Sequence, residues 1–294
     1  MIHEERTGVG AGGEFRFIAV GNGLVGWVRN DLPQELLVDL VRDPKIFFSA
    51  PASEILKNVR KATVIRRVVN DREGVARRVI IKRFHPGSLL RRAGSLIVPS
   101  RAARCLRAAL LLKKAGIETA SPLVALESRK WKGLGASYYM SEELTSVQSL
   151  RALLKHILSA FPQTEGRLLK FRLLRGVARL FYQLHASGIY HRDLKGSNIL
   201  VCGWESPRWE LLLVDLDGVS RMGYLWRSRR IKNLVQLCRI RSWSVRDKIY
   251  FLKNYSDLFP LEKAGRKRLW RKVLALSDKR KAGEPDSGQA TRPR

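Results

Sequence analysis

Cysteine is scarce in this sequence. The three that occur, Cys105, Cys202 and Cys238, are odd in number and far apart, so they predict neither a disulfide framework nor a metal site. No apolar run approaches the ~18 residues needed to cross a bilayer, and the charged segment 1–6 lacks the apolar stretch of a secretory signal. We therefore expect a cytoplasmic protein without disulfides or membrane spans.

Acidic residues are few beside basic ones. The chain has 56 Lys and Arg against 26 Asp and Glu, a formal net charge of +30, and residues 221–281 alone hold 19 basic and 4 acidic residues. Such a charge attracts polyanions and anionic membrane surfaces. Zinc spacings, RNA-binding signatures and runs of stacking aromatics do not occur in the sequence, so we expect no specific nucleic-acid partner.

The basic segment also carries aromatic residues that suit either a headgroup interface or the core of a helical lobe, and we favour the core. They are Tyr224, Trp226, Trp243, Tyr250, Phe251, Tyr255 and Trp270.

Residues 190–199, YHRDLKGSNI, bring together polar groups suited to phosphoryl transfer. Asp193 can accept a proton from an attacking hydroxyl, and Lys195 can offset charge that grows on the transferred group. Asn198 and, after an apolar run, Asp215 offer the hard oxygens that Mg²⁺ prefers. The opposing interpretation is that Asp193 and Asn198 are ordinary turn residues.

The surrounding pattern favours the chemical interpretation. Residues 172–187 predict a helix with one apolar stripe, and Gly188 stands where a C-terminal cap belongs. The order that follows is loop, strand at 199–201, turn, buried strand at 211–214 and acid. That order is the context that a phosphoryl-transfer motif requires.

Three segments carry a resemblance to a known fold. HRDLKGSNIL (191–200) resembles the catalytic loop of the protein-kinase-like fold, VDLDGV (214–219) resembles its metal-binding segment, and VIIK (79–82) is similar to its lysine strand. RRIKNL (229–234) and DKIYFLKNY (247–255) further resemble the lipopolysaccharide core kinase (Kdo/WaaP) family.

The resemblance implies an α+β, two-lobed fold with an antiparallel sheet N-lobe and a mainly helical C-lobe. The expected domains are a strand-and-helix extension (1–50), the N-lobe (51–144), the C-lobe (145–277) and a disordered basic tail (278–294).

It also implies roles for single residues, with ATP and Mg²⁺ as cofactors. Asp193 would be the catalytic base, and Lys195 would contact the γ-phosphate. Lys82 would hold the α- and β-phosphates, while Asn198 and Asp215 would hold the metal. Residues 139–144 resemble the hinge, where Glu142 and Leu144 would meet adenine.

The glycine-rich pattern GNGLVGWV (21–28) matches a kinase phosphate loop but lies too far before Lys82, so we interpret it as a hairpin turn. The better candidate is the glycine-free segment 58–63, with Asn58, Arg60 and Lys61. A basic solvated turn is an equally good interpretation of this segment.

The chain departs from the kinase pattern in three further ways. Asp217 stands where the metal segment usually has glycine, as a metal ligand or, in the interpretation we favour, a turn cap. The expected helix at 101–115 contains no Glu to pair with Lys82, and no A-P-E segment follows Asp215.

We therefore expect a kinase that phosphorylates a heptose or Kdo hydroxyl of the lipopolysaccharide inner core. It would act on this anionic glycolipid while bound peripherally to the anionic inner leaflet of the inner membrane. The alternative is a protein serine/threonine kinase. A nucleotide-binding pseudokinase is disfavoured by the intact polar set.

Overall fold

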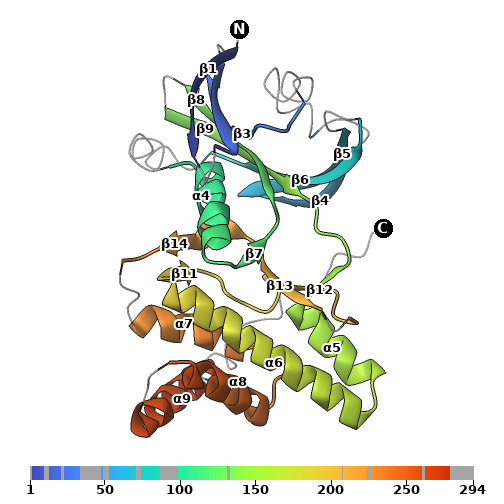
Figure 1. The fold of residues 1–294 in the computed structure, drawn as a ribbon, viewed down its shortest axis with the longest axis vertical. Helices are drawn as coiled ribbons and strands as arrows, with labels where there is room; N and C mark the ends of the chain where they lie inside the picture. The colour runs from blue at the N-terminus through green and yellow to red at the C-terminus, as the bar shows by residue number, and fades with distance from the viewer. Residues whose placement is uncertain are drawn as a thin grey trace. The chain divides into compact units, whose positions relative to one another are not determined.

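The structure is a computed structural model, drawn as a ribbon in Figure 1. It describes residues 2–9, 13–20, 23–33, 48, 53–70, 74–86, 99–130, 133–206, 208–223, 227–259 and 262–278. The chain divides into two compact units. The N-terminal unit consists of Met1–Val147 and Leu212–Val219, and the C-terminal unit consists of Gln148–Leu211 and Ser220–Arg294.

An eight-stranded antiparallel sheet forms most of the N-terminal unit, in the order β1-β2-β3-β8-β9-β6-β5-β4. Its strands are β1 (Ile2–Val9), β2 (Phe15–Val20), β3 (Leu24–Arg29), β4 (Glu54–Val59), β5 (Ala62–Asn70), β6 (Ala76–Phe84), β8 (Pro122–Lys130) and β9 (Gly133–Glu142). Because β3 pairs with β8, the segment expected as a separate extension adds its strands to the same sheet that carries Lys82.

The glycine pattern at 21–28 belongs to the β2–β3 hairpin. Gly23 has a φ of +80° in the turn, and a Cβ on Gly26 within β3 would collide with the carbonyl oxygen of Ala125 on β8. These two glycines therefore serve backbone conformation and strand packing. Residues 21 and 22 lie outside the described residues.

Lys82 lies on the face of the sheet opposite its main core. Val79 and Ile81 are buried in a cluster with Ile65 and Met140. Since side chains alternate along a strand, Lys82 projects from the other face.

Helix α4 (Arg101–Lys114) packs against β8 and β9 (Figure 1). Ser100 caps its start by accepting a hydrogen bond from the Ala103 N–H at 3.1 Å. Gly116, with a φ of +66°, ends it. The helix predicted at 101–115 is thus confirmed. Beyond it, β7 (Glu118–Thr119) pairs in parallel with β13 (Glu210–Leu213), and a 3₁₀ turn, η2 (Leu216–Gly218), follows.

The C-terminal unit is mainly helical. Its described helices are α5 (Leu150–Ala160), α6 (Gln163–Ala186), α7 (Arg227–Cys238), α8 (Val245–Asp257) and α9 (Lys263–Asp278), and short strands are β10 (Val147–Ser149), β11 (Ile189–His191), β12 (Ile199–Cys202) and β14 (Val219–Arg221).

Helix α6 is the centre of this unit and packs on α5 and α8. It begins nine residues before the expected start at 172. The predicted stripe of Leu174, Val177, Phe181 and Leu184 is fully buried. Gly188, with a φ of +68°, follows the last turn as predicted.

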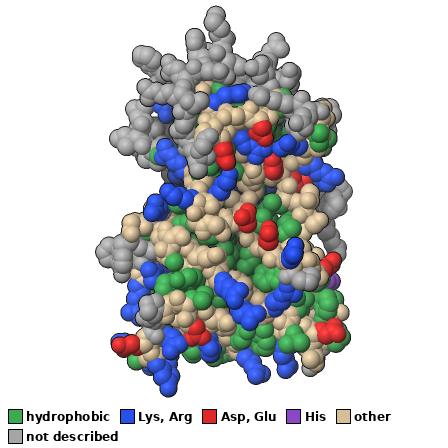
Figure 2. Space-filling model, viewed as in Figure 1, with side chains coloured by type: hydrophobic (Ala, Val, Ile, Leu, Met, Phe, Trp, Pro, Cys, Tyr) green, Lys and Arg blue, Asp and Glu red, His purple; other side chains and the backbone are tan. Residues whose placement is uncertain are grey.

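The aromatic residues of the basic segment belong mainly to the core, as favoured. Trp243, Phe251 and Tyr255 are buried, and the Trp270 indole donates to Ser256 Oγ at 3.1 Å. Tyr224 and Trp226 lie outside the described residues. On the face drawn in Figure 2, Lys and Arg side chains are spread over the C-terminal helices among hydrophobic ones.

All three cysteines are free thiols. Burial raises the pKa of Cys105 and of Cys238 to about 12. None of the described helices combines the length and apolar character of a membrane span.

Two predicted segments fall partly on residues outside the described ranges. They are the extension, of which residues 34–47 lie outside, and the tail, of which residues 279–294 lie outside.

Candidate active site

The loop between β11 and β12 brings three predicted residues together within the C-terminal unit. The Lys195 Nζ lies 2.7 Å from Asp193 Oδ2. The Asn198 amide donates to the Asp193 carbonyl oxygen at 2.8 Å and lies 3.4 Å from Asp193 Oδ2. The Asp193 side chain is 45% exposed. The loop therefore presents an accessible carboxylate beside an ammonium group.

Helix α7 fixes the main chain of this loop. Asn233 Nδ2 donates to the His191 carbonyl oxygen at 2.6 Å, and Gln236 Nε2 donates to the Arg192 carbonyl oxygen at 2.7 Å. Gln236 Oε1 also accepts from the Leu194 N–H at 3.2 Å. Two amide side chains, one helical turn apart, thus hold the main chain at His191, Arg192 and Leu194. The sequence reasoning missed both, although Asn233 lies in the RRIKNL segment.

A buried histidine supports Asn233 from behind. The His185 Nδ1 lies 2.8 Å from Tyr255 Oη, and its Nε2 lies 3.3 Å from Asn233 Oδ1. Burial, opposed by the Asn233 hydrogen bond and aided by Arg230, lowers the pKa of His185 to about 4. The ring is therefore neutral at pH 7, and the support of the loop extends to α8.

In the N-terminal unit, Lys82 lies beside the predicted metal ligand. Its Nζ is 3.8 Å from Asp215 Oδ1, and the Asp215 side chain is 50% exposed. Asp215 has a φ of +63° and a ψ of +55°, a left-handed conformation that non-glycine residues rarely adopt. Lys82 thus takes its carboxylate partner from the metal segment.

Asp217 forms an ion pair that sequence reasoning did not foresee. Both Arg101 Nε and Nη2 donate to Asp217 Oδ2, at 2.8 and 2.6 Å. The Asp217 side chain is only 7% exposed. The favoured role of Asp217, a cap of the following turn, stays a prediction. The acid and the cation are 116 residues apart in sequence, so no local pattern could indicate the pair.

Residues 58–63 form the tip of the β4–β5 hairpin, next to the lysine strand in the sheet. Asn58 Oδ1 accepts from the Thr63 hydroxyl at 3.1 Å, while Arg60 and Lys61 are exposed. Beside Lys82 in register are Val64 on β5 and Tyr139 on β9. The hairpin therefore has the connectivity of a phosphate-covering turn.

The predicted hinge residues differ in what their main chain can offer. The Glu142 N–H donates to the Ser121 carbonyl oxygen at 2.9 Å, and the Glu142 carboxylate pairs with Arg29 and Arg77. Leu144, two residues later, lies beyond the end of β9 and is half-buried. The N–H of Glu142 is thus engaged, which leaves Leu144 as the better candidate for adenine.

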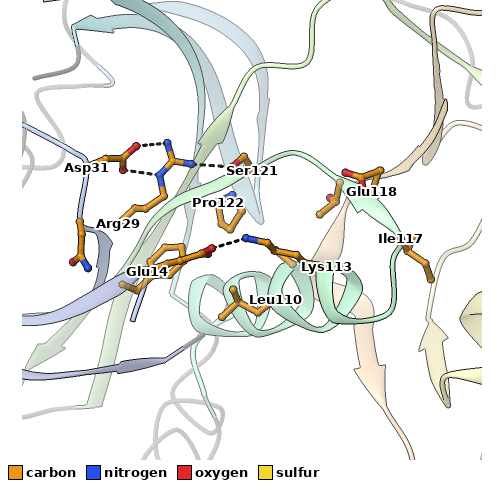
Figure 3. A pocket seen from close by; sticks show the side chains of 13 residues that line it. Glu14, Arg29, Asp31, Leu110, Lys113, Ile117, Glu118, Ser121 and Pro122 are labelled. Atoms are coloured by element: carbon orange, nitrogen blue, oxygen red, sulfur yellow. Dashed lines mark hydrogen bonds and ion pairs between the residues drawn. The ribbon is translucent and has the colours of Figure 1, made fainter. Parts of the chain in front are cut away.

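A separate pocket of about 610 Å³ lies between the first strands of the sheet, the end of α4 and the start of β8 (Figure 3). Arg29 pairs with Asp31, and Lys113 pairs with Glu14, at its wall. None of the predicted site residues lines it.

The order of these elements, an antiparallel sheet with one packed helix and a catalytic loop in a helical unit, defines a protein-kinase-like fold. A structure of WaaP in complex with acyl carrier protein has this fold, with a TM-score of 0.60 and 23% identity over 84% of this chain and 97% of that one. The Toxoplasma gondii rhoptry antigen kinase domain aligns with a TM-score of 0.42 and 12% identity, over 76% of this chain and 74% of that one. The predicted fold class is confirmed.

The model of the lipopolysaccharide kinase (Kdo/WaaP) family matches residues 90–255, more than half of the chain. The chain belongs to this family, which confirms the resemblance seen in the sequence. The expected enzyme class, a phosphotransferase with an alcohol acceptor, agrees with that of the family.

One curated protein, a putative cyclin-dependent kinase F-2 of Oryza sativa subsp. japonica, is 44% identical over 62 residues. These residues make up 21% of this chain and 16% of that protein, so the chain spans about a sixth of the length of this relative.

Proposed function

We propose that this protein transfers the γ-phosphoryl group of ATP to a heptose or Kdo hydroxyl of the lipopolysaccharide inner core. The observation that carries the proposal is the catalytic loop, in which the half-exposed Asp193 carboxylate lies 2.7 Å from Lys195 Nζ. Two hydrogen bonds from α7 to the main chain support this arrangement. The family supports the class of acceptor.

Asp193 acts as the general base. It takes the proton of the sugar hydroxyl as the hydroxyl oxygen bonds to the γ-phosphorus. The bond from the γ-phosphorus to its bridging oxygen breaks, and ADP leaves with that electron pair. Lys195 offsets the negative charge on the transferred group, since its ammonium lies beside the base.

The N-terminal unit binds the nucleotide. Lys82 contacts the α- and β-phosphates, with Arg60 and Lys61 adding positive charge from the hairpin. The N–H of Leu144 meets the adenine edge, and Val64, on the Lys82 face of the sheet, offers apolar contact to the ring. Because the hairpin tip has no glycine, its backbone N–H groups approach the phosphates less closely. The charges of Arg60 and Lys61 bind the phosphates in their place.

Asn198 and Asp215 have the donor chemistry of magnesium ligands. Asn198 uses its amide nitrogen on Asp193, which leaves its carbonyl oxygen for a cation, and half of the Asp215 side chain is exposed. Mg²⁺, when bound, offsets charge on the phosphates.

The protein docks on the inner leaflet of the inner membrane through charge rather than through inserted aromatics. The exposed basic residues of α7 and α9 support this part of the proposal, since Trp243, Phe251 and Tyr255 are buried. They are Arg227, Arg229, Lys232, Lys263, Lys267, Arg268, Arg271 and Lys272. Each basic side chain near an anionic leaflet contributes about 1 kcal/mol.

The test supplies labelled ATP with truncated lipopolysaccharide, and separately with a generic protein acceptor. Lipopolysaccharide that is already fully phosphorylated is the control acceptor. Label in the core sugars of the truncated glycolipid alone is the expected result. Equal labelling of the control acceptor, or no labelling of either glycolipid, contradicts the proposal.

A protein serine/threonine kinase is the second candidate. The 62-residue match to a putative cyclin-dependent kinase favours it, as does the Lys at two residues after Asp193. Label that appears in the protein acceptor and not in the glycolipid selects this function.

A further inference from the structure

A single guanidinium group, that of Arg101, contacts three segments of the proposed nucleotide site. Its Nε and Nη2 donate to Asp217 Oδ2 in the metal segment. Its Nη1 donates to the Lys61 carbonyl oxygen, at the hairpin tip, at 3.1 Å. The guanidinium carbon lies 4.3 Å from the ring centroid of Phe84, two residues after Lys82 on β6.

The start of α4 fixes where this guanidinium stands. Arg101 is the first residue of the helix, directly after the Ser100 cap. The helix packs against β8, β9 and η2, so the arginine is held by the body of the N-terminal unit. The side chain is one-third exposed, whereas its Asp217 partner is nearly buried.

Asp217 is two residues from Asp215, which needs support in its left-handed conformation. A non-glycine residue is strained in that region and persists only where its surroundings impose the conformation. Asp215 is the N-cap residue of the short 3₁₀ turn η2, and Asp217 lies within that turn. An anchor at Asp217 therefore limits how far the Asp215 carboxylate can move relative to Lys82.

We propose that Arg101 is a positioning residue, which acts through Asp217 to hold the Asp215 carboxylate at the metal site and, through Lys61, the hairpin over the phosphates. The inference rests on the proposed function. Helix α4 has no Glu to offer Lys82, and instead contributes an arginine that binds the metal segment. The position of α4 therefore affects how tightly the site binds Mg²⁺.

The test uses the full chain with three variants, Arg101→Met, Asp217→Asn and the double variant. Methionine keeps an apolar stem over Phe84, and the double variant leaves neither charge uncompensated, so it retains the fold if a single variant does not. Arg107→Met, on an exposed position of the same helix, is the matched control. Arg101→Lys tests rescue by a conservative change.

Two quantities are measured. The first is binding of a fluorescent ATP analogue titrated with Mg²⁺, without acceptor, and the second is kcat. We expect the half-saturating Mg²⁺ concentration to rise about tenfold in each single variant. The double variant should be no worse than either single one, Arg101→Lys should be intermediate, and Arg107→Met should match the parent.

The inference is overturned if Arg101→Met and the double variant have the same half-saturating Mg²⁺ concentration as Arg107→Met. This holds even if a smaller fraction of the variant protein is active. If the parent chain fails to bind the analogue at any Mg²⁺ concentration, the proposed function itself falls, and the inference with it.

Discussion

Acid should destabilise the C-terminal unit through His185. The ring is 1% exposed. Asn233 uses its amide nitrogen on the His191 carbonyl oxygen, so its Oδ1 accepts from His185 Nε2, and His185 Nδ1 accepts from the Tyr255 hydroxyl. If the ring took a second proton, Nδ1 would carry a hydrogen. It could then no longer accept the hydrogen bond of the Tyr255 hydroxyl.

The size of the effect follows from the pKa of His185, which burial lowers from 6.5 to about 4. The unfolded chain binds the proton below pH 6.5, whereas the folded chain binds it only near pH 4. The free energy of unfolding therefore falls as pH drops between these values. Relative to pH 8, the loss is about 2 kcal/mol at pH 5 and about 3 kcal/mol at pH 4.

The assay is urea denaturation between pH 8 and pH 4, followed by tryptophan fluorescence, for the parent, His185→Gln and His156→Gln. His156 is exposed on α5 and serves as the control. Acid titration of other groups affects all three proteins alike, so the difference between variants isolates His185. If His185→Gln loses as much stability on acidification as the parent, His185 is not the group that makes the unit sensitive to acid.

Three further predictions concern the proposed site. Lys82→Met should lower kcat/KM for ATP about 100-fold, because the positive charge that contacts the phosphates is lost. Lys113→Met, at the separate pocket, should leave kcat/KM unchanged. Gln236→Ala should lower kcat about tenfold with KM for ATP unchanged, since it loosens only the catalytic loop; an altered KM would count against this role. Binding to anionic vesicles should fall steeply between about 0.05 and 0.5 M salt, and salt-insensitive binding would argue against electrostatic docking.

Much of the fold could be predicted because its signals are local. The α6 stripe and the glycine after that helix each lie within a few residues of the feature that they determine. The catalytic loop is likewise a contiguous segment. Its internal contacts, from Asp193 to Lys195 and Asn198, span at most five residues.

The rest depended on contacts between distant segments. The pair of Arg101 with Asp217 and the support of the loop by Gln236 join residues 116 and 44 positions apart. The placement of β3 beside β8 follows from strand pairing, which the glycine pattern alone does not encode. A sequence offers the residue types for such contacts but not the choice of partner.

The role of Asp193 is tested most directly by comparing nucleotide binding with turnover in Asp193→Asn. Glu165→Gln, an exposed carboxylate on α6, is the control. Because a general base contributes about 100- to 10,000-fold to the rate, we expect a loss of that size in kcat with little change in the affinity for Mg·ATP. Phosphate transfer by Asp193→Asn at the rate of the control would show that Asp193 is not the base.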